Sequence, residues 1–124
     1  HHSLIENLLR VKLPFEPSIP AQEAAFGSLD DIVHLEDTLR LNAVGIEYFY
    51  EEFKKLKLKY IPSITNFVTI QLPNNKEANY LLDSLLKNGV IVRGLGGFGL
   101  PDCIRISVGT MEENIFLLKN LKKL

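Results

Sequence analysis

Apolar side chains recur every three or four positions through the middle of the chain. This period matches the turn of an α-helix, so the pattern predicts one long amphipathic helix. Ser28 and Asp31 precede it and form a candidate capping pair at its start. We expect one face to lie against a core and another to meet a second surface. The core face comprises Ile32, Leu35, Leu39, Ala43, Ile46, Tyr50, Phe53 and Leu56.

Prolines separate two shorter helical segments before the long helix. Residues 4–11 and 21–26 have the composition of helices, and Gly27 and Ser28 are expected to end the second one. Between them lies KLPFEPSIP, which is predicted to be extended and rigid because proline fixes its own backbone and restricts the preceding residue. Its prolines are Pro14, Pro17 and Pro20.

The second half of the chain changes to short strands. They are predicted at residues 60–61, 65–72, 90–93 and 103–108. A helix over 78–86, ended by Gly89, separates the second strand from the third. Thr110 and Glu113 make a capping box for a last helix to Leu124. The order β-β-α-β-β-α predicts an α+β fold (an α/β sandwich): a small, mostly antiparallel sheet with helices packed on one face.

Charge and hydropathy exclude two classes of partner. The chain has 14 basic and 15 acidic side chains and a net charge of −1. It therefore lacks the basic footprint of a protein that binds nucleic acid or an anionic membrane. No apolar run approaches the roughly 18 residues that a membrane-spanning helix needs.

A single cysteine, Cys103, limits the covalent and metal chemistry of the chain. It can form neither an intrachain disulfide nor a cysteine metal cluster, so no metal site is expected. One unpaired cysteine fits a reducing compartment, and we expect a cytoplasmic protein. His1 and His2 are interpreted as the remnant of an affinity tag. The chain does not begin with Met, and we expect it to be a piece of something longer.

The stretch GLGGFG, residues 94–99, matches the G-x-G-x-x-G dinucleotide fingerprint. That fingerprint works only when the glycines open a helix, whose N-terminus then meets the pyrophosphate. Here the glycines are followed by an expected turn at Pro101 and Asp102, and then by a strand. The sequence therefore favours a plain glycine loop between two neighbouring strands.

Two arginines flank this loop. In CIRISV, Ile104 and Ile106 alternate with Arg105, so Arg105 is expected to project from the sheet face opposite the core. Arg93 is expected to close its strand at the edge of the loop. Alternation alone favours a solvated arginine on an open face. The alternative is that two guanidinium groups, brought together by the loop, bind the anionic ends of one ligand.

Other reactive side chains give weaker signals. His34 has no partner at metal-ligand spacing and is expected on the surface or at an interface, and Cys103 is expected to serve packing. Ser84 and Lys87 match S-x-x-K without its companion motifs. Asn66 is expected to face the core and to bond to backbone.

The chain resembles the C-terminal part of the histidinol-phosphate aminotransferases, which are pyridoxal-phosphate (PLP) enzymes of fold type I. The resemblance runs in order over residues 4–124. Its most specific pieces are TNF, GVIVR and IRISVGTMEEN. PFEPSIPAQ is similar to the connection between the two domains of that family.

The resemblance implies a division of the chain and a role for its arginines. Residues 3–28 correspond to the interdomain helix and connection, and residues 29–124 to the small domain that completes the substrate site. Arg105 corresponds to the arginine that binds the substrate carboxylate or its equivalent, and Arg93 to one that reaches the phosphate of histidinol phosphate.

The resemblance also implies what lies elsewhere. The large domain with the PLP lysine is absent from this chain, so this piece is expected to hold no catalytic residue, to bind no PLP and to be inactive alone. The full enzyme would be a homodimer acting on an amino donor and a 2-oxo acid in histidine biosynthesis. Two alternatives remain: the small domain of an aromatic or other amino-acid aminotransferase, and a non-catalytic anion-binding module.

Overall fold

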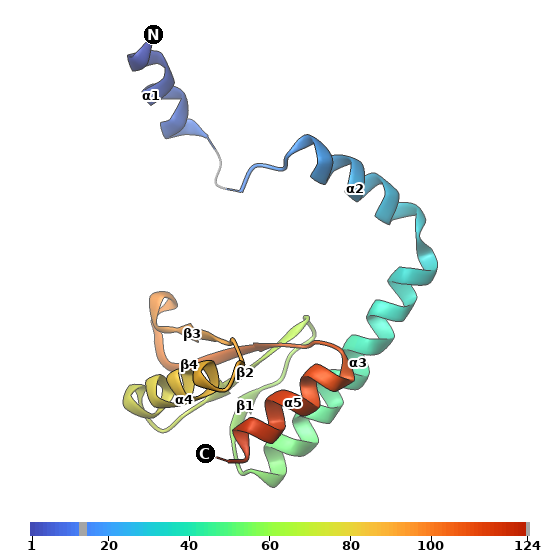
Figure 1. The fold of residues 1–124 in the computed structure, drawn as a ribbon, viewed down its shortest axis with the longest axis vertical. Helices are drawn as coiled ribbons and strands as arrows, with labels where there is room; N and C mark the ends of the chain where they lie inside the picture. The colour runs from blue at the N-terminus through green and yellow to red at the C-terminus, as the bar shows by residue number, and fades with distance from the viewer. Residues whose placement is uncertain (13–14, 124) are drawn as a thin grey trace. The chain divides into compact units, whose positions relative to one another are not determined.

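Four short strands form one antiparallel sheet in the order β1-β2-β4-β3, so the last strand in the sequence lies inside the sheet. The computed structural model describes residues 1–12 and 15–123. The strands are β1 (Lys59–Ile61), β2 (Phe67–Gln71), β3 (Arg93–Leu95) and β4 (Leu100–Ser107). The expected antiparallel sheet and the expected order of elements are confirmed (Figure 1).

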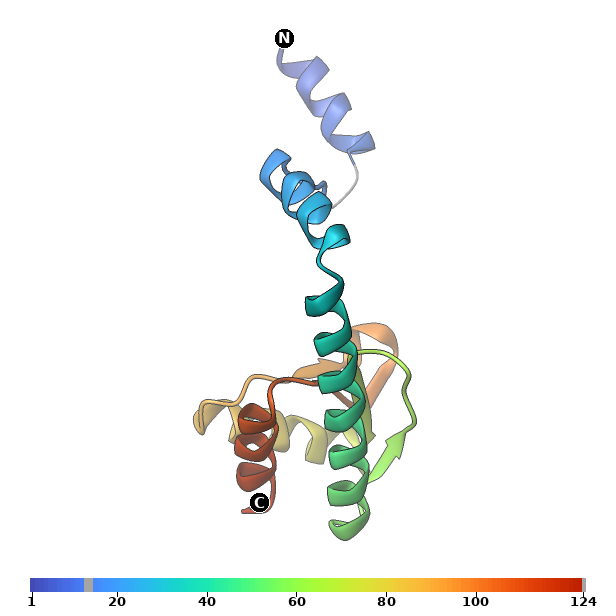
Figure 2. The same cartoon turned by 90° about the vertical axis from the view of Figure 1, so that its right-hand side faces the viewer.

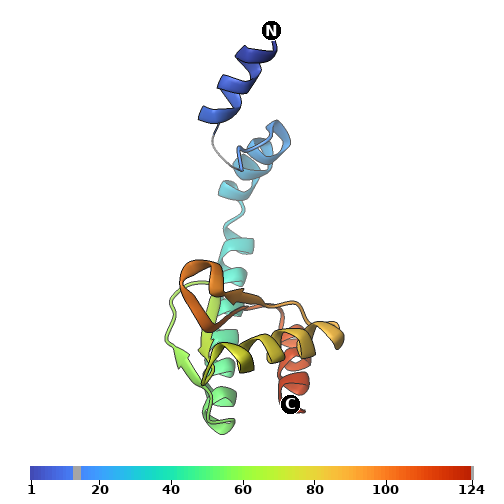
Figure 3. The same cartoon turned by 90° about the vertical axis from the view of Figure 1, so that its left-hand side faces the viewer.

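Three helices cover one face of this sheet. They are the C-terminal part of α3 (Ile32–Lys55), α4 (Asn75–Lys87) and α5 (Met111–Leu121). Figure 2 shows α5 beside this part of α3, and Figure 3 shows α4 running across the direction of α5. The core between helices and sheet comprises Phe49, Phe53, Val68, Ile70, Ala78, Leu81, Leu85, Val90, Ile104, Ile106, Leu117, Leu118 and Leu121.

The helix ends follow the local chemistry that the sequence predicted. Thr110 and Glu113 form the capping box of α5. Gly89 has a left-handed backbone (φ +79°) after α4, and the next N–H, that of Val90, donates to the carbonyl of Leu85. This is the bond pattern of a glycine-terminated helix. The last helix ends at Leu121, short of the predicted Leu124, which lies outside the described residues.

The long helix α3 buries a different set of side chains from the one predicted. Ile46, Tyr50 and Leu56 pack at the edge of the core, and Phe53 is fully buried. Ile32, Leu35, Leu39 and Ala43 are exposed. The positions buried most deeply are Gly45, Phe49, Glu52 and Phe53. Periodicity selected Phe53 but missed Gly45 and Glu52, because no hydrophobic pattern selects a glycine or a glutamate, and it also missed Phe49.

The chain divides into two compact units, one up to Glu36 and one from Asp37. The first contains α1 (His2–Val11) and α2 (Ile19–Asp30). The expected helix end at Gly27 and Ser28 is wrong, because α2 continues to Asp30 with the Ser28 hydroxyl donating to the carbonyl of Ala24. Ser28 is therefore no cap for α3. Asp31 alone accepts from the backbone N–H of His34, at 2.9 Å.

The proline-rich connection is only in part as predicted. Ser18 caps α2 and Pro20 lies in its first turn, where proline is tolerated because the first N–H groups of a helix have no partner inside it. The expected extended stretch therefore ends before Ile19. Pro14 lies outside the described residues.

The strand boundaries differ most from the prediction around β3 and β4. The expected strand over 90–93 is wrong: β3 begins at Arg93, and Ile91 is 85% exposed. The expected turn at Pro101 and Asp102 is also wrong, because β4 already starts at Leu100. A register shift between Gly94 and Leu95 accompanies this early start. Such an irregularity accommodates a proline, which cannot donate to the sheet.

A buried carboxylate joins α3 to α5. Glu52 is only 6% exposed and accepts a hydrogen bond from the Lys55 ammonium at 2.7 Å. It also forms an ion pair with Lys122, just beyond the end of α5. The hydrogen bond with Lys122 and then that with Lys55 lower the pKa of Glu52, against the burial that raises it.

This carboxylate should make folding stability depend on pH. The folded-state pKa of Glu52 lies below its unfolded value, so its contribution is present above about pH 4.3 and is lost as the pH falls through the folded pKa. We expect Glu52→Gln to be less stable than the parent at pH 7, and the difference to shrink towards pH 3. Urea unfolding at each pH measures this.

Glu112→Gln is the matched control, because Glu112 is an exposed glutamate on α5. It should change the free energy of unfolding by less than about 0.5 kcal/mol at every pH. A constant difference between Glu52→Gln and the parent across this pH range would contradict the role given to the Glu52 carboxylate.

Candidate functional site

Two arginines lie directly opposite each other on neighbouring strands. In the β3–β4 pair, Arg93 and Arg105 are register partners, and on its other side Arg105 pairs with Thr69 of β2. Directly opposed residues share a sheet face. Ile104 and Ile106 are fully buried under the helices while Arg105 is half-buried. Both arginines therefore belong to the face away from the helices, as the alternation predicted for Arg105.

Each guanidinium group lies over an aromatic ring. The Cζ of Arg105 is 5.0 Å from the ring centre of Phe67, and that of Arg93 is 5.4 Å from the ring centre of Phe98. Ion pairs in the described part of the chain involve neither arginine. A shallow hollow between β3 and β4 is lined by Ile91, Val92, Arg93, Arg105 and Ser107.

The glycine-rich segment is the connection between these two strands. Gly94 and Leu95 still belong to β3, Gly96–Phe98 form one 3₁₀ turn, and Gly99 has a left-handed backbone (φ +78°) before β4. The expected connection between neighbouring strands is confirmed. It is no dinucleotide loop, since the fingerprint needs a helix after the glycines and here a strand follows.

The electrostatics of the pair favour an anion. Like charges directly opposite each other in a sheet repel, and both guanidinium groups present several N–H donors in a planar fork. A carboxylate or phosphate placed between them would remove the repulsion and accept charge-assisted hydrogen bonds. The arrangement can thus bind an anionic group at the open face of the sheet.

The remaining candidates from the sequence do not join this site. Cys103 is 3% exposed, and burial, followed by the charge of Asp102, raises the pKa of its thiol. It is a packed thiol rather than a nucleophile. His34 is exposed on α3, and Ser84 and Lys87 lie on α4, on the helix side of the sheet. The expectation that Asn66 faces the core is wrong, because it is exposed.

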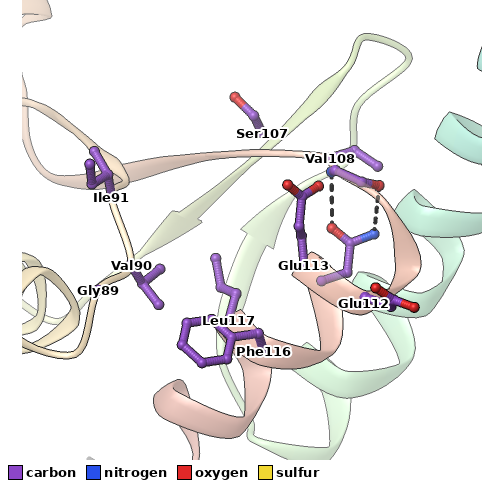
Figure 4. Close-up of a pocket in the computed structure, with 11 residues that line it drawn as sticks. Gly89, Val90, Ile91, Ser107, Val108, Glu112, Glu113, Phe116 and Leu117 are labelled. Atoms are coloured by element: carbon purple, nitrogen blue, oxygen red, sulfur yellow. Dashed lines mark hydrogen bonds between the residues drawn. The ribbon is translucent and has the colours of Figure 1, made fainter.

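A larger hollow lies on the helix side (Figure 4). Val90 and Ile91 lie on one side of it, and Phe116 and Leu117 of α5 on the other. Its buried amide, Asn114, accepts from the N–H of Gly109 and donates to the carbonyl of the same residue. These bonds fix the turn between β4 and α5, so this polar group already has a structural partner.

The described residues offer no lysine suited to binding a cofactor covalently. A lysine that forms a Schiff base is typically desolvated, which lowers its pKa. Every described lysine side chain is exposed. Within residues 1–12 and 15–123, no group of three or more His, Cys, Asp or Glu side chains could hold a metal ion. No helix in this part of the chain is long and apolar enough to cross a membrane.

Comparison with known proteins identifies the family of the chain. The family model for aminotransferase class I and II matches residues 1–121. The chain belongs to this family. Its members depend on PLP. The expected resemblance and the expected small-domain fold are thus confirmed.

Individual members of the family cover the chain almost completely. It is 40% identical to histidinol-phosphate aminotransferase 1 of Idiomarina loihiensis over 124 residues, which are 33% of that protein. The chain thus spans about a third of the length of the curated relatives it matches.

Solved structures share the fold. The structure of histidinol-phosphate aminotransferase from Sinorhizobium meliloti in complex with PLP matches 83% of this chain and 29% of its own, with a TM-score of 0.76 and 27% identity. A decarboxylase from Sulfurospirillum multivorans matches 99% of this chain and 36% of its own, with a TM-score of 0.70. At 24% identity, that second likeness concerns the fold alone.

The like-charged pair should lower the stability of the chain. Arg93→Gln removes one of two opposed charges, which favours the variant at low salt, and also the contact of Arg93 with Phe98, which favours the parent. We expect the free energy of unfolding of Arg93→Gln to fall relative to the parent by a few tenths of a kcal/mol between low salt and 0.5 M NaCl, because salt screens the repulsion. Urea unfolding at both salt concentrations measures it.

Arg40→Gln is the control, and its change should have the opposite sign. Arg40 forms an exposed ion pair with Asp37 at 3.0 Å on α3. Its replacement should lower stability slightly at low salt. If the stability of Arg93→Gln relative to the parent did not fall between low salt and 0.5 M NaCl, the pair would not be repulsive.

Proposed function

We propose that this chain is the substrate-binding small domain of a PLP-dependent aminotransferase, and that the whole enzyme acts on histidinol phosphate. It would transfer the amino group of histidinol phosphate to 2-oxoglutarate, which gives imidazole acetol phosphate and glutamate, or catalyse the reverse reaction. The observation that supports this most strongly is the opposed pair Arg93 and Arg105, without an acidic partner among the described residues.

Both arginines are assigned to the substrate. Arg105 lies on the inner strand β4, bonded on both sides, and is the better fixed of the two. It binds the phosphate of histidinol phosphate, which is the anionic group beside the reacting carbon, or the equivalent carboxylate of glutamate. Arg93 is exposed on the edge strand β3 and binds the same phosphate from the edge of the sheet. Their position as register partners supports a shared ligand.

The cofactor site is assigned to the part of the enzyme that this chain does not span. PLP supplies the electron sink for amino-group transfer. The exposed lysines described above do not fit its covalent attachment. The chain's own contribution is to bind and orient the substrate.

The same proposal accounts for the apolar helices of the first unit. Residues 3–28 would form the interdomain connection and residues 29–124 the small domain. Apolar side chains that are more than half exposed lie on both helices of the first unit, and a soluble chain normally covers such surface. They are Leu4, Ile5, Leu8, Leu9 and Val11 of α1, and Ile19, Phe26 and Leu29 of α2. Their partner is the large domain, in a cytoplasmic homodimer.

Replacing the arginines in the enzyme that carries this chain tests the assignment. We expect Arg105→Ala to lower kcat/KM about 10- to 100-fold for both substrates, because a charged hydrogen-bond donor to the substrate is lost. Arg93→Ala should lower kcat/KM about tenfold for histidinol phosphate and hardly at all for glutamate. Steady-state kinetics with each substrate measures both.

Arg40→Ala is the control and should leave both substrates within twofold of the parent. If Arg93→Ala left turnover of histidinol phosphate unchanged, an aromatic or other amino-acid aminotransferase would be favoured. If Arg105→Ala left every transamination unchanged, the remaining interpretation would be a non-catalytic anion-binding module.

The 124-residue chain by itself should not bind PLP as a holoenzyme does. We expect no lasting visible absorption band when the chain is mixed with stoichiometric PLP, because its lysines are exposed rather than desolvated. The enzyme that carries the chain is the positive control. A band that forms at stoichiometric PLP and survives dialysis would place a cofactor lysine within these residues.

A further inference from the structure

The rings that contact the two arginines belong to Phe67 and Phe98, which lie outside the buried core. Phe98 is 64% exposed, in the loop between β3 and β4. Phe67 is half-buried at the start of β2, on the open face of the sheet. Neither belongs to the buried core. Their observed contacts with Arg93 and Arg105 are therefore their most distinctive interactions.

Backbone geometry brings each ring to its arginine. Thr69 is the register partner of Arg105, and Phe67 lies two residues before Thr69 on the same face, which makes it a diagonal neighbour of Arg105. Phe98 follows Arg93 by five residues and returns to it through the 3₁₀ turn Gly96–Phe98. Gly99 then takes the left-handed conformation that most other residues avoid. The glycine-rich loop thus carries a ring back to Arg93.

We propose that Phe67 and Phe98 are positioning residues for anion binding, Phe67 for Arg105 and Phe98 for Arg93. This inference rests on the proposed function, in which the two arginines bind the substrate anion. It adds that the rings determine where the two guanidinium groups stand before the anion arrives.

The physical reason is preorganisation. A free arginine side chain has many rotamers, and ordering it on binding weakens affinity. A ring attracts a guanidinium group placed over its face and so restricts those rotamers. The N–H donors of a guanidinium group lie in its own plane, so a group stacked on a ring keeps its edges free for a carboxylate or phosphate. A carboxylate partner would instead occupy those donors.

The rings also offset the repulsion between the two guanidinium groups. Phe67 attracts Arg105 towards β2, and Phe98 attracts Arg93 towards the loop. The two groups are thereby held in place although they repel each other and have no acidic partner among the described residues. An anion then meets a pair of charges that is already ordered.

Arginine side-chain NMR of the full 124-residue chain tests this inference, with inorganic phosphate as the probe. The chain contains only Arg10, Arg40, Arg93 and Arg105, so ¹⁵N-arginine labelling gives four Nε–H signals. The variants are Phe67→Leu, Phe98→Leu and the conservative Phe67→Tyr and Phe98→Tyr. Phe116→Leu is the control, since it removes a half-exposed ring on α5.

We expect Phe67→Leu to remove the ring-current shift of the Arg105 signal, to leave that of Arg93 in place, and to raise the dissociation constant for phosphate about two- to fivefold. Phe98→Leu should remove the ring-current shift of the Arg93 signal, leave that of Arg105 in place, and weaken phosphate binding to a similar extent. Both tyrosine variants should keep the signals and the affinity, because a tyrosine ring also attracts a cation. The shifts report the proximity of each ring, whereas a purely structural role would not give weaker phosphate binding that is rescued by tyrosine.

Two results would overturn the inference, and a third would also overturn the anion site of the proposed function. Leucine variants that bind phosphate like the parent, or tyrosine variants as weak as leucine, would show that the rings do not position the arginines. Arg105→Ala distinguishes failure of the positioning role from failure of the anion site itself. If it weakens phosphate binding while Phe67→Leu does not, only the positioning role fails. If Arg105→Ala has no effect, the anion site of the proposed function fails as well.

Discussion

The site depends on strand β4 being bonded on both sides. Because β2 and β3 both pair with β4, its backbone cannot turn about its own axis, and its side chains must alternate between two fixed faces. Ile104 and Ile106 face the helices and are fully buried. A shift by one residue would exchange them for Arg105. Burial of the two isoleucines therefore fixes the direction in which Arg105 projects.

The same constraint explains a local arrangement that stability alone would not select. A sheet face that served only folding would pair Arg105 with an acidic or neutral neighbour, whereas its partner on β3 is a second arginine. By contrast, the buried Glu52 has two lysine partners. Local choices that oppose stability are concentrated at functional sites. The contrast between the neutralised Glu52 and the uncompensated arginines is thus an argument for a ligand at the open face.

The sequence predicted the presence of the helices and strands better than their boundaries and buried positions. Alternation in CIRISV and TNFVTIQL was sufficient for β2 and β4, and Thr110 and Glu113 located the start of α5. The pattern failed where tertiary contacts decide. Gly45 and Glu52 are buried on α3 although neither is apolar. An added Cβ at Gly45 would collide with Val108, and no local signal shows that close approach.

Prediction of the site was limited in the same way. The two arginines were found because each interrupts an apolar run, but their position as register partners follows from the bulged β3–β4 connection. Phe67 and Phe98 were missed for a related reason. An aromatic residue at a strand start or in a glycine loop has many structural explanations, and only the fold brings these two to the arginines.

The fold itself does not determine the reaction. A decarboxylase shares the backbone arrangement over nearly the whole chain, so the sheet and its helices are compatible with more than one outcome for the substrate. In the proposed function, this chain selects the anionic group of a small molecule through residues on one sheet face, and the bond that breaks is selected where the cofactor binds. On that proposal, substrate specificity and reaction type could change separately, because different parts of the polypeptide would carry them.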